Sequence, residues 1–251
     1  MAETPTICVV GSGNMGRAIG ISLAKAQCSV FFAGRKPSEA PKAAAELARK
    51  YSSEVQYGTI SNGIKFGDVV VWTTRETDVT KVIDETGIDN LKKKSFMVVL
   101  DVNNWNFDEV IKTGIGASLD KESRGEQLQK SFNGHVAHMC VYKAFTTVPM
   151  EIFALEEDAR RKLKVQAFLA SLNDTDPGAL HRAKAVVGTL GFEPVDLGTG
   201  PQAVRMAEMM GDVMRFCLSR GAGNGAWSHL SISGVEPASI DSIGGRVAGY
   251  K

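Results

Sequence analysis

The stretch that decides the fold is Ile7-Cys8-Val9-Val10-Gly11-Ser12-Gly13-Asn14-Met15-Gly16. Its first four residues are short and apolar, which is typical of a buried parallel strand, and residues 17–26 continue as a predicted helix. Between them the glycines are spaced G-x-G-x-x-G. At a turn from strand to helix, this spacing predicts a binding site for the pyrophosphate of a dinucleotide.

Each glycine has its own predicted role. Gly11 permits the tight turn, Gly13 lets the backbone approach a pyrophosphate, and Gly16 lets the helix pack closely on the strand. The free N–H groups and the positive dipole end of the helix would face the phosphates. We therefore expect the whole turn to bind the cofactor: Gly11, Ser12, Gly13, Asn14, Met15 and Gly16.

The end of the second predicted strand, residues 29–32, indicates which dinucleotide binds. NAD-binding domains usually carry an acidic residue there, but Arg35 and Lys36 occupy the place in this chain. A carboxylate would repel a 2′-phosphate, whereas a guanidinium binds it through paired charge-assisted bonds. Ser38 is expected to cap the next helix, and its hydroxyl could also reach the phosphate. The prediction is NADP, and the alternative is that both cations are solvated surface charges.

Strands and helices alternate along the rest of the chain. We expect further strands at 54–57, 68–72, 95–100, 136–142, 164–170 and 193–196, and helices at 39–50, 79–84, 123–132, 177–190 and 202–219. This alternation predicts an α/β fold, a Rossmann-like doubly wound parallel sheet with a C-terminal helical extension. Residues 1–200 would form the NADP-binding domain. Residues 201–251 would pack on that domain or on a dimer partner.

Polar residues follow several of these strands, at the edge where open α/β sheets bind ligands. We expect Thr73, Thr74 and Asn103 to contact the cofactor, although plain turn chemistry also explains the two threonines. Thr146 and Thr147 are candidate substrate contacts. Lys143 is the candidate catalytic residue, because it could orient a substrate or donate a proton there. A structural ion pair is the alternative interpretation of Lys143.

The helix predicted at 202–219 has an apolar stripe at helical spacing and several methionines. Hydride transfer requires a dry pocket, and this helix is the long amphipathic element left over once the sheet is built. We expect Met206 and Met210 to wall the substrate pocket, within one chain or at a dimer interface. The alternative is that the helix only packs on the sheet.

Composition excludes several other classes of function. The chain has 251 residues, a formal net charge of +1 and 43% hydrophobic residues, so it offers no broad basic surface for nucleic acid or an anionic membrane. No apolar run approaches the roughly 20 residues of a membrane span. The four cysteines show no C-x-x-C spacing, which favours buried thiols in a reducing compartment and no metal site. We expect a cytoplasmic protein, without a secretory signal, that forms a homodimer and binds a small molecule.

In the order of its motifs the chain resembles the deazaflavin (coenzyme F420)-dependent NADP oxidoreductases. This family is close to the pyrroline-5-carboxylate reductases and to the cytosolic domains of membrane metalloreductases. The resemblance rests on the glycine turn at 11–16, on Ala33-Gly34-Arg35, and on the segments 143–149 and 191–198. It implies that the glycine turn and Arg35 hold NADP and that the loop 73–75 lies beside the nicotinamide. Thr74 and Thr146 depart from the family pattern, which often has Pro and Asn there.

The predicted function is that of an NADPH-dependent oxidoreductase, transferring hydride between NADP(H) and a small organic acceptor of the deazaflavin or imine type. Such acceptors need no protein nucleophile. A ketone would usually need a proton donor, but the chain has no Tyr-x-x-x-Lys motif and no His–Asp pair, and His135 and His138 are more typical of structural histidines. The alternative is a protein that binds NADP for a structural, regulatory or non-redox purpose without turning it over.

Overall fold

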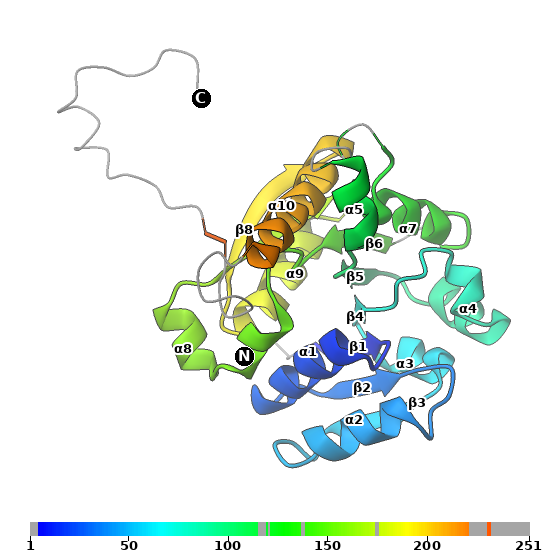
Figure 1. The fold of residues 1–251 in the computed structure, drawn as a ribbon. Coiled ribbons are helices and arrows are strands. Elements are labelled where there is room, and N and C mark those ends of the chain that lie inside the picture. The colour runs from blue at the N-terminus through cyan, green and yellow to red at the C-terminus, as the bar shows by residue number, and fades with distance from the viewer. Residues whose placement is uncertain are drawn as a thin grey trace, which may run out of the picture.

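A central sheet of eight strands organises the computed structural model, which describes residues 5–114, 119, 121–136, 139–173, 176–220 and 230–231 (Figure 1). His138 and most of the chain beyond residue 220 lie outside the described residues. The strands are β1 (Ile7–Val10), β2 (Val30–Ala33), β3 (Val55–Gly58), β4 (Val69–Trp72), β5 (Met97–Asp101), β6 (Met139–Lys143), β7 (Gln166–Ser171) and β8 (Glu193–Thr199).

Helices connect and cover these strands. The α-helices are α1 (Asn14–Lys25), α2 (Ala40–Ala48), α3 (Ile60–Phe66), α4 (Glu85–Lys92), α5 (Phe107–Thr113), α7 (Arg124–Asn133), α8 (Glu157–Lys162), α9 (Pro177–Thr189) and α10 (Pro201–Ser219). Two short 3₁₀ helices are η1 (Val79–Lys81) and η2 (Met150–Ala154). Neither α5 nor α8 is among the helices that the sequence predicts.

The strand order is β3-β2-β1-β4-β5-β6-β7-β8, and the order reverses between β1 and β4. Strands β1 to β6 are parallel, as predicted. Strand β7 runs antiparallel to β6, and β8 is parallel to β7. The sheet is therefore mostly parallel, and its direction changes at β7. The connection after β6 contains only η2 and α8, and a parallel neighbour would need a crossover that returns along the sheet.

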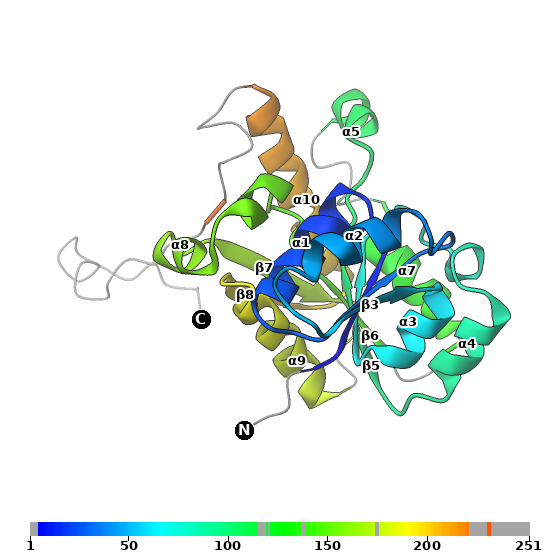
Figure 2. The ribbon, with the colours of Figure 1, turned by 90° about the horizontal axis from the view of Figure 1, so that it is seen from below.

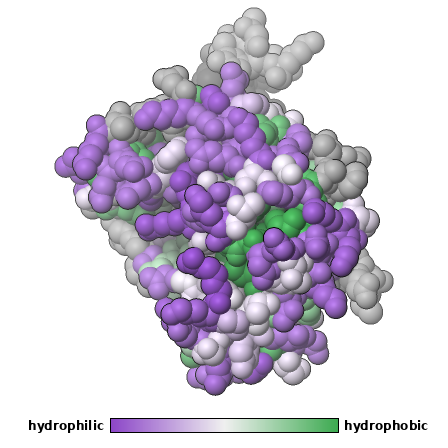
Figure 3. All heavy atoms as spheres, turned by 90° about the vertical axis from the view of Figure 1, so that its right-hand side faces the viewer, coloured by the Kyte–Doolittle hydropathy of each residue, from purple (hydrophilic) through white to green (hydrophobic). Residues whose placement is uncertain are grey.

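Apolar side chains fill both faces of the sheet, which confirms the doubly wound arrangement. One core cluster joins the strands to α1, α2 and α9, and a second joins them to α3, α4 and α7. Figure 2 shows α4 and α7 on one side of the sheet and α8 and α9 on the other. In the face drawn in Figure 3, hydrophobic residues gather near the centre and hydrophilic residues surround them.

Local signals set several helix ends, and two predictions about them are wrong. Ser123 caps α7 in a reciprocal capping box with Glu126, and Asp176 caps α9. Ser38 caps no helix, because α2 begins after Glu39 without any side-chain cap. The helix predicted at 79–84 is only the short η1, and the longer α4 begins later, after Asp84 caps it through the N–H of Gly87 at 2.8 Å.

The C-terminal helix α10 lies against β7 and β8, and it also contacts α5, α7 and β6. Val204 and Ala207 form a small apolar cluster with Ala170 of β7. Helix α10 therefore covers the part of the sheet beyond β6, next to the carboxyl end of that strand (Figure 1).

Candidate cofactor cleft and the polar edge beside it

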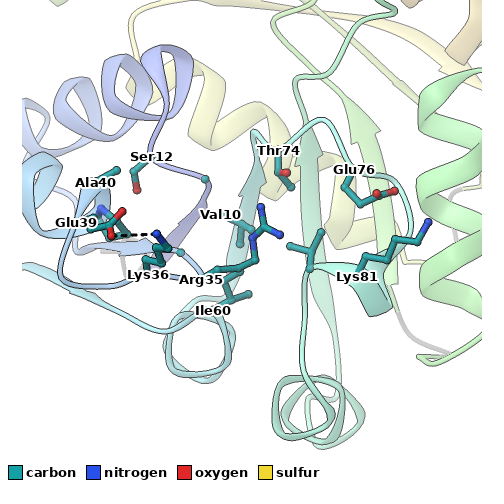
Figure 4. A pocket seen from close by; sticks show the side chains of 14 residues that line it. Val10, Ser12, Arg35, Lys36, Glu39, Ala40, Ile60, Thr74, Glu76 and Lys81 are labelled. Atoms are coloured by element: carbon teal, nitrogen blue, oxygen red, sulfur yellow. Dashed lines mark ion pairs between the residues drawn. The ribbon is translucent and has the colours of Figure 1, made fainter.

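A cleft of about 460 Å³ opens at the carboxyl ends of β1, β2 and β4. This is where the strand order reverses, the place where open α/β sheets bind their ligands. Figure 4 shows the side chains that line it: Ser12, Lys36 and Glu39 lie on one side, Thr74, Glu76 and Lys81 on the other, and Arg35 between them.

The glycine turn has the geometry that its sequence predicts. Gly11 has φ +98°, a conformation that favours glycine. A Cβ on Gly16 would lie 2.0 Å from the carbonyl oxygen of Gly11, so only glycine lets α1 approach β1 this closely. A Cβ on Gly13 would meet nothing within 4 Å, so the space beside its backbone is open.

Polar groups at this turn fit a phosphate. The amides of the first turn of a helix have no partner within the helix, and α1 begins here without a side-chain cap. The hydroxyl oxygen of Ser12 is buried and has no hydrogen-bond partner. An unpartnered buried hydroxyl is costly unless a ligand supplies the missing bond. The turn therefore fits a dinucleotide pyrophosphate.

The cations after β2 lie at the same cleft. Arg35 and Lys36 both line it and are both exposed. Lys36 pairs with Glu39 at 3.2 Å, an exposed pair that contributes little to stability. The side chain of Arg35 extends into the cleft towards Val10 (Figure 4), where its guanidinium is available to an anion. Seven of the predicted cofactor residues do not line the cleft: Gly13, Asn14, Met15, Gly16, Ser38, Thr73 and Asn103.

Sequence reasoning missed part of the lining. Pro41 and Ala40 from the start of α2, Ile60 from α3, and Val82 after η1 form apolar walls. A smaller hollow of about 290 Å³ adjoins the cleft and shares Arg35, Ile60 and Val82 with it. Apolar walls beside a cation suit a flat base next to its phosphate. No sequence motif marks these residues, since they come from three separate connections.

At the ends of β4 and β5, Thr74 forms the wall of the cleft, and Thr73 and Asn103 lie behind it without lining the cleft. Thr73 donates from Oγ1 to the carbonyl oxygens of Val10 (2.9 Å) and Gly11 (2.7 Å), so it supports the glycine turn from beneath. Thr74 lines the cleft. Asn103 is buried and donates from Nδ2 to the carbonyl of Thr74 at 2.6 Å. Asn103 and Thr73 thus hold the backbone of the wall in place.

Lys143 lies beneath this edge, with no exposed surface. Its Nζ lies 2.9 Å from Oδ2 of Asp101 and 3.0 Å from Oε1 of Glu208, and it also donates to the carbonyl of Asn103. Burial alone would lower the pKa of Lys143, but the two carboxylates raise it above its ordinary value, so the amine stays charged. The structure therefore supports the ion-pair interpretation over a catalytic one. Asp101 and Glu208 carry no motif that reveals this pairing from the sequence.

The candidate substrate residues lie where α10 covers the end of β6. Thr146 is buried and donates from Oγ1 to the carbonyl of Ala207 at 2.8 Å, so it joins the sheet to α10. Thr147 is also buried, and its hydroxyl has no hydrogen-bond partner. On α10, Met206 is 40% exposed and Met210 is partly buried. The structure brings these residues to one region but places none of them in the cleft.

Among the residues that the structure describes, no group of three or more His, Cys, Asp or Glu side chains could hold a metal ion. Cys8, Cys28 and Cys140 are buried cysteines outside any disulfide and Cys217 is exposed. Burial raises the pKa of Cys28 to about 11, which leaves that thiol unreactive. No helix in the described part of the chain has both the length and the apolar character to cross a membrane.

Comparison with known proteins supports the resemblance. Residues 6–104 match the model of the family described as "NADP oxidoreductase coenzyme F420-dependent". The match spans β1 to β5 and so includes the glycine turn, Arg35, and Thr74 with Thr73 and Asn103 behind it. None of the curated proteins matches the chain.

Solved structures share the fold. A putative F420-dependent NADP reductase from Arthrobacter sp. FB24 superposes with a TM-score of 0.63 and 22% identity, covering 88% of this chain and 96% of that one. A hypothetical protein from Sinorhizobium meliloti superposes with a TM-score of 0.56 and 21% identity, covering 79% of this chain and 87% of that one. An imine reductase from Myxococcus stipitatus in complex with NADP+ gives 0.55 and 16%, covering 86% of this chain and 62% of that longer one.

At these identities the structures show the fold, and the family match adds the cofactor and the class of reaction. The Rossmann-like fold is therefore confirmed. Residues 6–104 of this chain match the family of coenzyme F420-dependent NADP oxidoreductases, and this match supports an NADP cofactor and the oxidoreductase class.

Proposed function

We propose that this protein is a reductase that uses NADPH to reduce a small organic acceptor of the deazaflavin or imine type. The observation that carries the proposal is the cleft at the carboxyl edge of the sheet. It combines the unpartnered hydroxyl of Ser12, the open space at Gly13 and the exposed guanidinium of Arg35. Together they offer binding groups for a pyrophosphate and, farther along, for a 2′-phosphate.

The residues of the cleft bind and orient the cofactor, which when bound supplies the hydride at C4 of its nicotinamide. The backbone amides at the start of α1 and the Ser12 hydroxyl hold the pyrophosphate. Arg35 binds the 2′-phosphate, with Lys36 beside it. Thr74, with Thr73 and Asn103 behind it, forms the wall beside the nicotinamide half.

The substrate lies on the far side of that wall, where α10 approaches the sheet. Met206 and Met210 provide apolar surface that keeps water from the reacting atoms. Thr146 and Thr147 border the same region, and the unpartnered hydroxyl of Thr147 is the group there that could bond to a substrate. An acceptor of the deazaflavin or imine type takes the hydride without a protein nucleophile, which fits the burial of Lys143.

We also propose that the enzyme is a cytoplasmic homodimer. The proposed contact surface is helix α10, where Met206 is exposed. Light scattering of the purified protein tests this, and a monomer at micromolar concentration would contradict it.

Loss of NADPH absorbance in the presence of a panel of acceptors tests the reaction. Reduced deazaflavin should form in one assay and amine from a cyclic imine in the other, with NADPH consumed in equal amount. Gly13→Val serves as the control that cannot bind the cofactor. If the protein binds NADPH tightly and no acceptor causes net consumption, the non-redox alternative holds and the proposed reaction is wrong.

A further inference from the structure

A series of polar contacts connects helix α10 with the wall of the cofactor cleft. Glu208 of α10 contacts Lys143 of β6, which contacts Asp101 at the end of β5. Asp101 uses its second oxygen, Oδ1, to accept from the backbone N–H of Asn103 at 3.0 Å. Asn103 then donates to the carbonyl of Thr74, which lines the cleft. The series is continuous from α10 to the cleft.

The same carboxylate also closes the start of α7. Glu208 accepts from the backbone N–H groups of Arg124 (3.1 Å) and Gly125 (2.9 Å), the first two residues of that helix. These amides and the helix dipole favour a negative charge there. A Cβ on Gly125 would lie 2.7 Å from the side chain of Lys143. Helix α7 is therefore packed directly onto the aliphatic part of the Lys143 side chain.

Stability alone is a weak reason for such a cluster. Asp101, Lys143 and Glu208 each have no exposed surface, and all three charges must be taken out of water. Replacing buried ion pairs with well-packed apolar residues is often neutral or stabilising. The ionic cluster differs from apolar packing in that its bonds have direction. Each bond fixes the position of one element relative to another.

We infer that Asp101, Lys143 and Glu208 are positioning residues, which set the wall at Thr74 and hold α10 in register with it. They touch neither cofactor nor substrate, and they act through Asn103 and Thr74. The inference rests on the proposed function, because it takes the cleft as the NADP site. It assigns the cluster to the nicotinamide side, since the Arg35 side of the cleft lies on β2 and does not belong to the series of contacts.

The test compares two ligands that share one half. NADPH occupies the whole site, whereas 2′,5′-ADP carries the adenosine and the 2′-phosphate but no nicotinamide. The main variant combines Asp101→Leu, Lys143→Met and Glu208→Met, which removes the charges together. We expect it to bind NADPH about 3- to 12-fold more weakly, which corresponds to the loss of one hydrogen bond. Its affinity for 2′,5′-ADP should equal that of the wild type.

A second variant keeps the inference testable if the first does not fold. Asp101→Leu alone removes the bond to the Asn103 N–H, keeps the bond from Lys143 to the Asn103 carbonyl, and leaves Lys143 and Glu208 as a balanced pair. A selective loss of NADPH affinity is again expected. A third variant, with Asp101→Asn, Lys143→Met and Glu208→Gln, keeps the acceptor oxygens without the charges. It should recover NADPH affinity relative to the apolar variant. Arg205→Gln is the matched control, because it breaks the ion pair between Arg205 of α10 and Glu126 of α7, which is not part of the series.

Three results decide the matter. A selective loss for NADPH in the apolar variants, absent in Arg205→Gln, supports the positioning role. Equal losses for both ligands, or no loss for either, would show a purely structural cluster and overturn the inference alone. If the wild type binds neither ligand, the proposed function fails, and the inference fails with it.

Discussion

Two glycines of the same turn should respond to substitution in opposite ways. A side chain on Gly13 has open space, because its Cβ would meet nothing within 4 Å, and its φ of −71° is open to any residue. A side chain on Gly16 would place Cβ 2.0 Å from the carbonyl oxygen of Gly11. We therefore predict that Gly13→Val removes cofactor binding and keeps the fold, whereas Gly16→Ala destabilises the protein.

The magnitudes follow from these contacts. Gly13→Val replaces the N-cap residue of α1, which lowers the free energy of unfolding by about 1 kcal/mol or less. The valine side chain also blocks the pyrophosphate from reaching the backbone amides. The loss of two charge-assisted bonds, about 3–6 kcal/mol, weakens NADPH binding by more than about 100-fold. Gly16→Ala must separate helix and strand by about 1 Å, an overpacking that costs about 1–3 kcal/mol. In a chain of this size each kcal/mol lowers Tm by about 2–4 °C.

Thermal unfolding with and without NADPH measures both effects in one assay. The wild type should gain Tm with NADPH, Gly13→Val should start near the wild-type Tm and gain nothing, and Gly16→Ala should start lower. Wild-type NADPH affinity in Gly13→Val would refute the placement of the pyrophosphate. Equal Tm losses in the two variants would refute the packing argument.

Three further predictions concern other parts of the molecule. Arg35→Ala should weaken NADPH binding by about 10- to 150-fold, because one charge-assisted contact is lost, and should leave the affinity for NADH unchanged. Titration of the wild type and the variant with both cofactors measures these affinities, and equal losses for the two cofactors would contradict selectivity for NADP. Met210→Ala should change the KM or kcat for the acceptor while NADPH affinity stays the same, and a loss of Tm with unchanged kinetics would make α10 a scaffold. Burial alone would raise the pKa of Glu126, but bonds from Arg205 and Ser123 hold it below its usual range. A carboxyl group with a lowered pKa stabilises the fold at pH values above its ordinary pKa of about 4.5, and this stability is lost as the pH falls through the folded-state pKa. Glu126→Gln should therefore make the free energy of unfolding depend less on pH in this acid range. An unchanged pH dependence in acid would contradict the prediction.

Local sequence patterns predict the proposed cofactor side of this protein. The glycine turn and the apolar strand before it have local physical requirements, namely a positive φ at Gly11 and close approach at Gly16, and both appear in the structure. Arg35 follows β2 at a fixed distance from that turn, so its place at the cleft was also predictable. Capping at Ser123 and Asp176 likewise depends on neighbours a few residues away.

The arrangement on the proposed substrate side depends on packing between elements that are far apart in the chain. The direction of β7 depends on how its connection packs, and no local pattern records it. Lys143 lies at the end of β6, where a residue often faces a ligand, but it is paired with two buried carboxylates. Asp101 lies 42 residues earlier on β5, and Glu208 lies later in the chain on α10. Charges so far apart in the chain meet only when the sheet has formed and α10 has packed against it. Whether a polar residue at a strand end faces a ligand or a buried partner is therefore set by packing between distant elements, while the pyrophosphate turn is set by the conformation of a few adjacent residues.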